Sequence, residues 1–143
     1  MEKKENRKQL VDTKIDVKVK IAALWVVLMI LYIYNDFFSL FTPNAITEII
    51  DGNMGPFPVT QGGLFSAALL MAIPSVMIYL SLTLKAKVNR WTNIVLSVGF
   101  IGVMVASIIG EWAFYQFMGV IEIIVNIVII WLAIKWPTSN ENG

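Results

Sequence analysis

The residues of this sequence with the clearest capacity for chemistry are polar groups placed inside long apolar stretches. They are Asp36, Glu111, Glu122 and Asn126. A carboxyl group in apolar surroundings can hold and release a proton or bind a small ligand. If these stretches span a bilayer, a charge at its centre costs roughly 2.5–3.5 kcal/mol on insertion scales, so we expect these groups to point into the protein or into a wet cleft.

The spacing of the polar residues predicts one shared pocket. The candidate pocket residues are Asp36, Glu122, Asn126, Glu111, Asn35 and Tyr32. Tyr32, Asn35 and Asp36 fall at positions i, i+3 and i+4, so they lie on one face of a helix. Glu122 and Asn126 are four residues apart and likewise share a face. We therefore expect the two faces to meet in an acidic pocket that binds or moves a small or lipophilic ligand or a proton.

The sequence contains neither cysteine nor histidine. Their absence excludes disulfides, thiolate metal sites, Fe–S clusters, Ser-His-Asp triads, His-based zinc sites and His-ligated haem. We therefore expect no metal and no cofactor, and an enzyme built on this chain would have only carboxylates, tyrosine or lysine for acid–base work. The net charge of +1 gives no reason to expect nucleic acid as a partner.

Four apolar segments must position these groups. Apolar residues make up 57% of the chain, above the 45–50% or so of soluble domains. A hydrocarbon core about 30 Å thick needs around 20 helical residues. The sequence thus predicts an all-α fold, a four-transmembrane-helix bundle that forms a single membrane domain over 1–143. The helices are expected at about 15–41, 62–84, 91–110 and 113–136, between a charged cytoplasmic tail at 1–10 and a second tail at 137–143.

The basic residues predict how the chain crosses the membrane. All 11 lysines and arginines precede or begin the first helix, lie between the second and third, or end the fourth. Basic residues are enriched on the cytoplasmic side of membrane proteins. We therefore expect a multi-pass protein of the bacterial inner membrane with the N- and C-termini in the cytoplasm.

The segment between the first two helices is expected to combine a short helix with irregular chain on the outer side. Residues 45–50 place apolar side chains on one face, and Asp51 and Gly52 supply turn chemistry after them. Pro56 and Pro58 then exclude a regular helix. We expect residues 54–59 to fold back over the bundle as a lid or partial plug above the acidic pocket.

Small residues and one proline predict how the helices pack. Pro74 lies near the middle of the second helix and should bend it, because proline removes one backbone hydrogen bond. Gly102, Ala106 and Gly110 recur at four-residue spacing in the third helix. Such a stripe lets helix backbones approach closely. We expect it to pack inside the bundle, with a homodimer interface as the alternative.

Three segments resemble a family of small bacterial four-helix membrane proteins of unknown function. They read LYIYNDFFSLF in the first helix, MGPFPVTQGGLFSAALLMAIPSVMIYLSLTLKAKVNRWTNIVL through the loop and second helix, and GEWAFYQFMGVIEIIV at the last turn. The resemblance covers about residues 15 to 137, and the family is broadly similar to the DoxX-type group. It implies an inner-membrane protein with both ends inside, and it implies no reaction.

Two classes of function fit these observations. The first is a membrane protein that binds or transports a ligand or a proton in the acidic pocket. The second is a non-catalytic accessory or scaffold subunit of a membrane complex, in which the polar groups serve assembly alone. The expected partners are the lipid bilayer and either a second copy of the chain or another membrane protein. Ligand density between the first and fourth helices would favour binding, whereas tight packing there would favour the scaffold.

Overall fold

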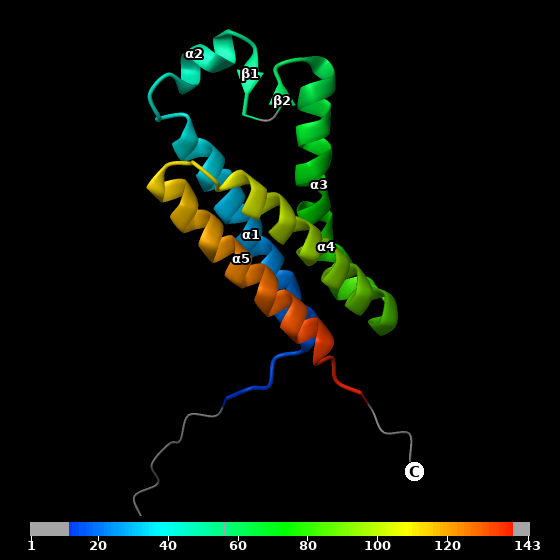
Figure 1. Ribbon diagram of the computed structural model, residues 1–143. Coiled ribbons are helices and arrows are strands. Elements are labelled where there is room, and N and C mark those ends of the chain that lie inside the picture. Colours follow the sequence, from blue (N-terminus) through cyan, green and yellow to red (C-terminus); the bar gives the residue numbers. More distant parts are fainter. Residues whose placement is uncertain (1–11, 56, 139–143) are drawn as a thin grey trace, which may run out of the picture.

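Four long helices form the body of the protein (Figure 1). A computed structural model describes residues 12–55 and 57–138, so the charged tail expected at 1–10 and most of the second tail lie outside the described residues. The helices are α1 (Val17–Ser39), α3 (Gln61–Thr83), α4 (Ala86–Ser107) and α5 (Ala113–Ile134). The all-α, four-span prediction is confirmed.

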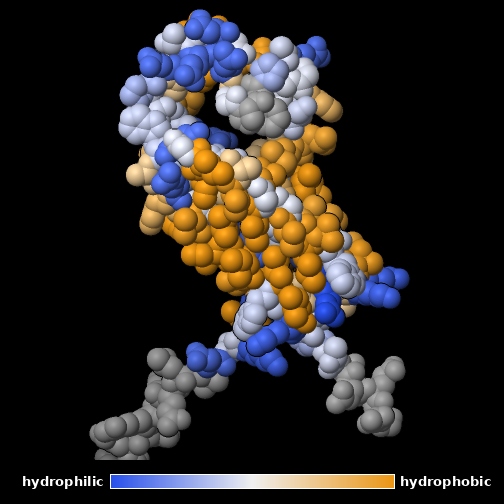
Figure 2. Space-filling model, in the orientation of Figure 1, coloured by the Kyte–Doolittle hydropathy of each residue, from blue (hydrophilic) through white to orange (hydrophobic). Residues whose placement is uncertain are grey.

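The surface of the helices is that of a membrane protein. Each of the four long helices is long and apolar enough to cross a bilayer. Figure 2 shows an apolar band around the middle of the molecule, with hydrophilic residues gathered above and below it. Because lipid chains are themselves apolar, large exposed apolar side chains such as Val95 of α4 are expected on helices that span a bilayer. The chain is a multi-pass membrane protein.

Helix α1 is the centre of the bundle. It packs extensively against α3 and α5, while α4 packs mainly against α5 and makes little contact with α3. Both ends of the described chain lie at the same end of the bundle (Figure 1), which we call the terminal end. The opposite end carries the short elements between α1 and α3, and we call it the loop end.

The start of α1 is set by a side-chain cap, and the bounds of α4 differ from those that hydropathy predicts. Helix α1 begins at Val17 because the Asp16 carboxylate accepts a hydrogen bond of 2.7 Å from the Lys18 N–H. Helix α4 begins at Ala86, five residues before the expected start at 91, because its first turn is polar yet helical. Its end is also earlier than expected, since Gly110 lies in the turn with a φ of 81° and not in the helix.

The loop end contains more regular structure than expected. Helix α2 (Ala45–Ile50) forms where the sequence predicted it. The expected plug is instead a minimal antiparallel pair of strands, β1 (Asn53–Met54) and β2 (Phe57–Pro58), packed on the start of α3. Gly63 permits this contact, because a Cβ there would collide with the Pro58 carbonyl.

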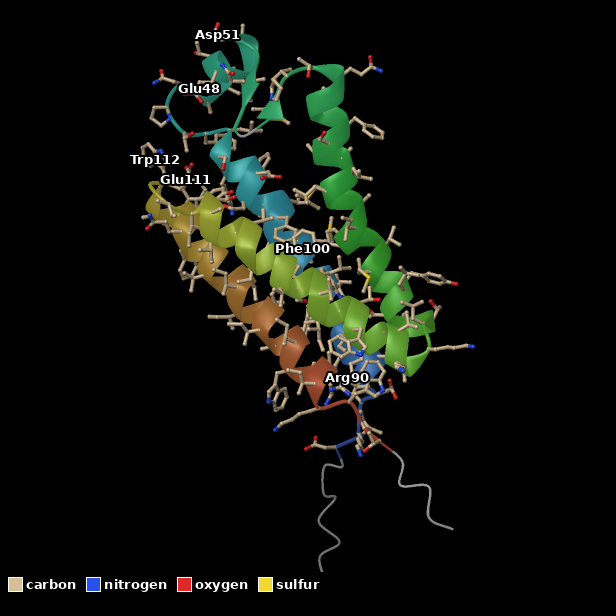
Figure 3. The ribbon with its side chains drawn as sticks, turned by 45° about the vertical axis from the view of Figure 1, so that its right-hand side comes forward. Glu48, Asp51, Arg90, Phe100, Glu111 and Trp112 are labelled. Atoms are coloured by element: carbon tan, nitrogen blue, oxygen red, sulfur yellow. The ribbon has the colours of Figure 1, made fainter. Side chains whose placement is uncertain are left out.

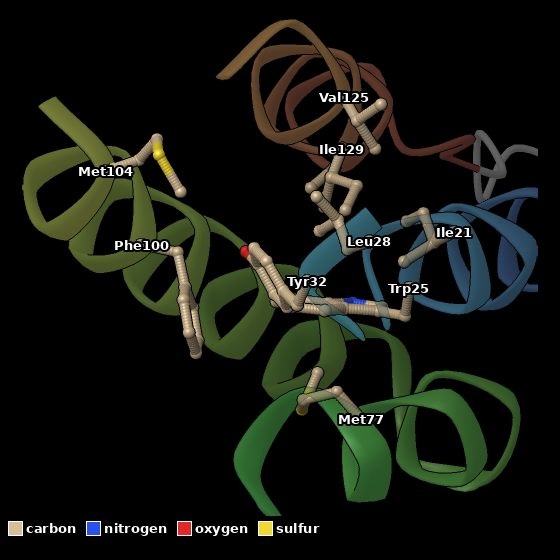
Figure 4. Packing of buried hydrophobic residues seen from close by; sticks show 10 residues of the cluster. Ile21, Trp25, Leu28, Tyr32, Met77, Phe100, Met104, Val125 and Ile129 are labelled. Atoms are coloured by element: carbon tan, nitrogen blue, oxygen red, sulfur yellow. The ribbon is translucent and has the colours of Figure 1, made fainter. Parts of the chain in front are cut away.

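Aromatic rings hold the bundle core together (Figure 4). The Phe100 ring of α4 packs edge-on against Trp25, with 6.0 Å between ring centroids, and stacks on Tyr32 at 5.9 Å. Leu28 of α1 and Ile129 of α5 are fully buried beside them. This layer lies between two groups of buried polar residues, which are described below.

Small residues pack differently from the prediction. Gly102 and Ala106 are exposed, and nothing lies within 4 Å of a Cβ added at Gly102. The expectation that they and Gly110 form an internal packing face is therefore wrong, and the alternative of a contact between copies stays a prediction. The close approach is made by Gly119 of α5 against α4. Pro74 is buried within α3, whose axis bends about midway in Figure 3.

Replacing Gly119 with alanine is expected to lower the free energy of unfolding by about 1–3 kcal/mol. A Cβ at this position would lie 2.8 Å from the Met104 sulfur and 2.5 Å from the Ile108 Cγ2, so these side chains or the helices that carry them must move. Gly102→Ala is the matched control, because its Cβ meets no atom within 4 Å and should change stability by no more than about 1 kcal/mol. Unfolding in mixed micelles measures both, and equal losses would contradict the close approach.

Candidate functional site

A saturated polar network occupies the terminal half of the bundle. It consists of Trp25, Ser81, Asn89 and Asn93, all fully buried, and we call it the terminal-end network. The Trp25 Nε1–H donates to the Asn93 Oδ1 at 2.7 Å, and the Ser81 hydroxyl donates to the same oxygen at 3.4 Å. The Asn93 Nδ2 donates to the Asn89 Oδ1, and the Asn89 Nδ2 donates to the Ser81 carbonyl, each at 2.6 Å.

The terminal-end network ties three helices together. It joins Trp25 of α1 to Ser81 of α3 and to the two asparagines of α4. None of its four side chains has a buried polar atom without a hydrogen-bond partner. A fully satisfied buried network specifies one packing arrangement. The network therefore has a structural role, which is to hold α1, α3 and α4 together. It was not predicted from the sequence.

A second buried group surrounds Glu122 toward the loop end. It consists of Tyr32, Asn35, Glu122 and Asn126, at most 7% exposed, and we call it the Glu122 cluster. The Asn35 Nδ2 donates to the Glu122 Oε1 at 3.4 Å, across the contact between α1 and α5. The Asn126 Nδ2 donates to the Glu122 backbone carbonyl at 3.0 Å, and Tyr32 lies beside the Asn126 amide. The structure thus brings together these four residues of the expected pocket.

The Glu122 cluster differs from the terminal-end network in being unsatisfied. Three of its side-chain oxygens have no hydrogen-bond partner: Asn35 Oδ1, Glu122 Oε2 and Asn126 Oδ1. The residues that carry them are 2%, 0% and 1% exposed, so bulk water does not reach these atoms. Leaving a buried acceptor unpaired costs roughly 1–3 kcal/mol. Three such atoms in one cluster mark a place where a bound species would be stabilised.

The other two predicted residues lie outside the buried cluster. Asp36 is exposed, although its charge lies within range of Glu122 and Tyr115. The expectation that Asp36 points into the interior with Glu122 is wrong, because one residue turns a helix by about 100° and the buried face of α1 passes through Asn35. Glu111 is exposed in the turn between α4 and α5.

Charge is distributed unevenly along the bundle. Figure 3 shows Glu48, Asp51 and Glu111 at the loop end and Arg90 near the terminal end. Every lysine and arginine in the described part of the chain lies just before or at the start of α1, in the α3–α4 connection and the start of α4, or at the end of α5. The field at the loop end is therefore negative and attracts cations.

An open hollow of about 420 Å³ lies near the loop end but does not contain the Glu122 cluster. Aromatic side chains from the end of α1 and the start of α5 line it, among them Phe38, Trp112 and Phe114. It is not the pocket expected beneath residues 54–59, because Pro58 packs against Gly63 instead. In residues 12–55 and 57–138, no group of three or more Asp or Glu side chains could hold a metal ion.

Comparisons with known proteins identify a family and leave its activity open. No curated protein and no solved structure matches the chain. The model of a family of unknown function, DUF6326, matches residues 2–142. Since this match covers nearly the whole chain, the protein belongs to the DUF6326 family.

Proposed function

We propose that this protein binds, and exchanges with the outer side of the membrane, a small ligand or a proton at the Glu122 cluster. The observation that carries the proposal is the set of three buried oxygens without a partner. The terminal-end network supports it by contrast, because its four side chains leave no buried polar atom unpaired. Elsewhere in the described chain only Arg90 Nε and Ser97 Oγ are buried and unpaired, and they form no cluster of oxygens. A cluster that served only to tie helices together would gain stability by being satisfied in the same way.

Access from the loop end supports the proposal. Asp36 is exposed and follows Asn35 of the cluster in α1, and its charge acts on Glu122, so a cation attracted to Asp36 is drawn toward the cluster. Glu48, Asp51 and Glu111 add negative charge at the same end. Clefts and surfaces of one sign raise the local concentration of the opposite charge. Toward the terminal end, the aromatic packing of Phe100 with Trp25 and Tyr32 and the terminal-end network separate the cluster from the surface.

Infrared spectroscopy of the reconstituted protein tests the proposal. We expect a buried carboxyl band that shifts in D₂O, changes reversibly with external pH and is absent in Glu122→Gln. Glu111→Gln is the matched control, because that carboxyl is exposed and its loss should leave the band intact. Tyr32 and Asp36 of α1 and Tyr115 of α5 are the neighbouring titratable groups. A Glu122 band that resists exchange for hours would contradict the proposal.

One observation favours an accessory or scaffold role as a second candidate. Gly102 and Ala106 form an exposed stripe on α4, and within the described residues no atom lies within 4 Å of a Cβ added at Gly102. Small residues on a membrane helix favour close association with another helix. Because the native chain has no cysteine, Gly102→Cys allows disulfide trapping in membranes without background. A trapped pair of this chain, or of the chain with another membrane protein, would support the scaffold role.

We propose that both termini face the cytoplasm of the inner membrane, and that the family is broadly DoxX-like in topology. All 11 lysines and arginines lie on one side of the proposed topology. A reporter fused after Gly143 is expected to be cytoplasmic, and a reporter inserted at 45–50 is expected to be periplasmic. An enzymatic reporter pair active on opposite sides measures this, and a periplasmic Gly143 fusion would refute the orientation.

A further inference from the structure

We infer that the Glu122 cluster takes a compact monovalent cation, either Na⁺ or a small primary ammonium ion. This inference rests on the proposed function and names the ligand class. The three partnerless atoms, Asn35 Oδ1, Glu122 Oε2 and Asn126 Oδ1, are all oxygens. A carboxylate oxygen and two amide oxygens accept hydrogen bonds or coordinate a hard cation, so the occupant must supply donors or positive charge.

Exchanging the oxygen and nitrogen positions of the Asn35 and Asn126 amides does not remove the need for donors or positive charge. The Asn35 Nδ2 already donates to the Glu122 Oε1, and the Asn126 Nδ2 already donates to the Glu122 carbonyl. Exchanging nitrogen and oxygen in either side chain would break the existing bond and would leave another buried atom unpaired. The unused capacity of the cluster is therefore for three accepted bonds, of which the Tyr32 hydroxyl beside the Asn126 amide can supply at most one.

The charge of the occupant follows from the carboxyl count. Glu122 is the one carboxyl of the cluster, and every described lysine and arginine lies toward the terminal end. One positive charge therefore balances the site, whereas a divalent ion usually takes more carboxylate oxygens. A proton on the Glu122 Oε2 turns that oxygen into one donor and leaves two partnerless acceptors, the amide oxygens of Asn35 and Asn126. A primary ammonium supplies three N–H donors, and Na⁺ accepts oxygen ligands directly.

The size of the occupant follows from burial. Asn35, Glu122 and Asn126 are at most 2% exposed, and the open hollow near the loop end lies elsewhere. A bulky quaternary ammonium ion has no N–H donor for the partnerless oxygens, and the residues that carry them are at most 2% exposed. A compact cation would enter from the side of Asp36, whose charge lies within range of Glu122.

Thermal unfolding in detergent under matched ionic strength tests the ligand class. The chlorides of Na⁺, NH₄⁺, methylammonium and tetramethylammonium are compared. We expect Na⁺ or the two small ammonium ions to raise the Tm by about 4 °C or more at a concentration of about 100 Kd, relative to tetramethylammonium. Glu122→Gln should abolish the shift, and Asp12→Asn, which changes an exposed carboxyl at the terminal end, should keep it. Equal shifts with all four salts, or a shift retained in Glu122→Gln, would overturn the inference.

A second measurement needs no variant. Equilibrium binding of ²²Na⁺ and ¹⁴C-methylammonium to the wild-type protein should show at least one of them saturating at about one ion per chain, with displacement by an excess of NH₄⁺. If neither ion binds saturably, the inference is overturned. Should the Glu122 carboxyl exchange protons while no cation binds, the cation inference alone fails. If the carboxyl does not exchange and no cation binds, the proposed function fails with it.

Discussion

Asn93→Leu is expected to lower the free energy of unfolding by about 3 kcal/mol. The Asn93 side chain accepts from the Trp25 Nε1–H at 2.7 Å and donates to the Asn89 Oδ1 at 2.6 Å. Leucine has a similar size but leaves both of those groups buried and unpaired. Each unpaired group costs roughly 1–3 kcal/mol, and a protein interior surrounded by lipid offers no bulk water to satisfy them.

The matched control for Asn93→Leu lies two positions along the same helix. Val95 is 63% exposed and faces lipid, so Val95→Leu should change stability by less than about 0.5 kcal/mol. Unfolding by SDS, followed by far-ultraviolet circular dichroism, measures both variants. A double-mutant cycle with Trp25→Phe should give a coupling energy of about 1 kcal/mol or more. Additive effects of the two substitutions would show that the Trp25–Asn93 bond adds nothing to stability.

Most helix bounds could be predicted from the sequence because a bilayer demands a minimum apolar length. Helices α1, α3 and α5 begin and end within two residues of the expected bounds. Helix α4 is the exception, because hydropathy detects where apolar residues begin and not where the backbone becomes helical. Its first turns contain Asn89 and Asn93, which are polar and yet fully buried.

Which face of each helix points into the bundle and which faces the lipid was harder to predict. In water an apolar face turns inward, but in a bilayer both the core and the surroundings are apolar. The outward orientation of Gly102 and Ala106 therefore could not be predicted from their apolar character. The orientation of polar residues can be predicted, because they are costly when they face lipid. The contact between Asn35 and Glu122 was therefore expected from their spacing along two helices.

The same rule could have found the terminal-end network. Asn89, Asn93 and Ser97 recur at four-residue spacing, so they lie on one face of α4, and polar groups at this depth are costly when they face lipid. Their partners could not be predicted, because Trp25 of α1 and Ser81 of α3 reach them only through the way the helices pack. Ser97 keeps its hydroxyl oxygen without a partner.

Glu122→Leu is expected to lower the free energy of unfolding by about 2 kcal/mol, whereas Glu122→Gln should leave it unchanged or raise it. Leucine removes the Oε1 that accepts from the Asn35 Nδ2, so both polar ends of a fully buried amide become unpaired. Asn126 does not distinguish the variants, because its Nδ2 donates to the Glu122 backbone carbonyl, which both substitutions retain.

Glutamine keeps the acceptor for Asn35 and replaces the partnerless Oε2 with an N–H₂ group inside a cluster that has two free amide oxygens. It therefore removes an unsatisfied acceptor and supplies donors, so the fold should tolerate it while the carboxyl chemistry is lost. Unfolding in mixed micelles without added Na⁺ or ammonium measures the two variants against wild type. If glutamine is the more damaging change, the wild-type carboxylate is stabilised by a cation already bound in the purified protein. If both variants match wild type in stability, the bond between Asn35 and Glu122 does not hold α1 to α5. The cluster would then lack the structural role that the scaffold hypothesis requires.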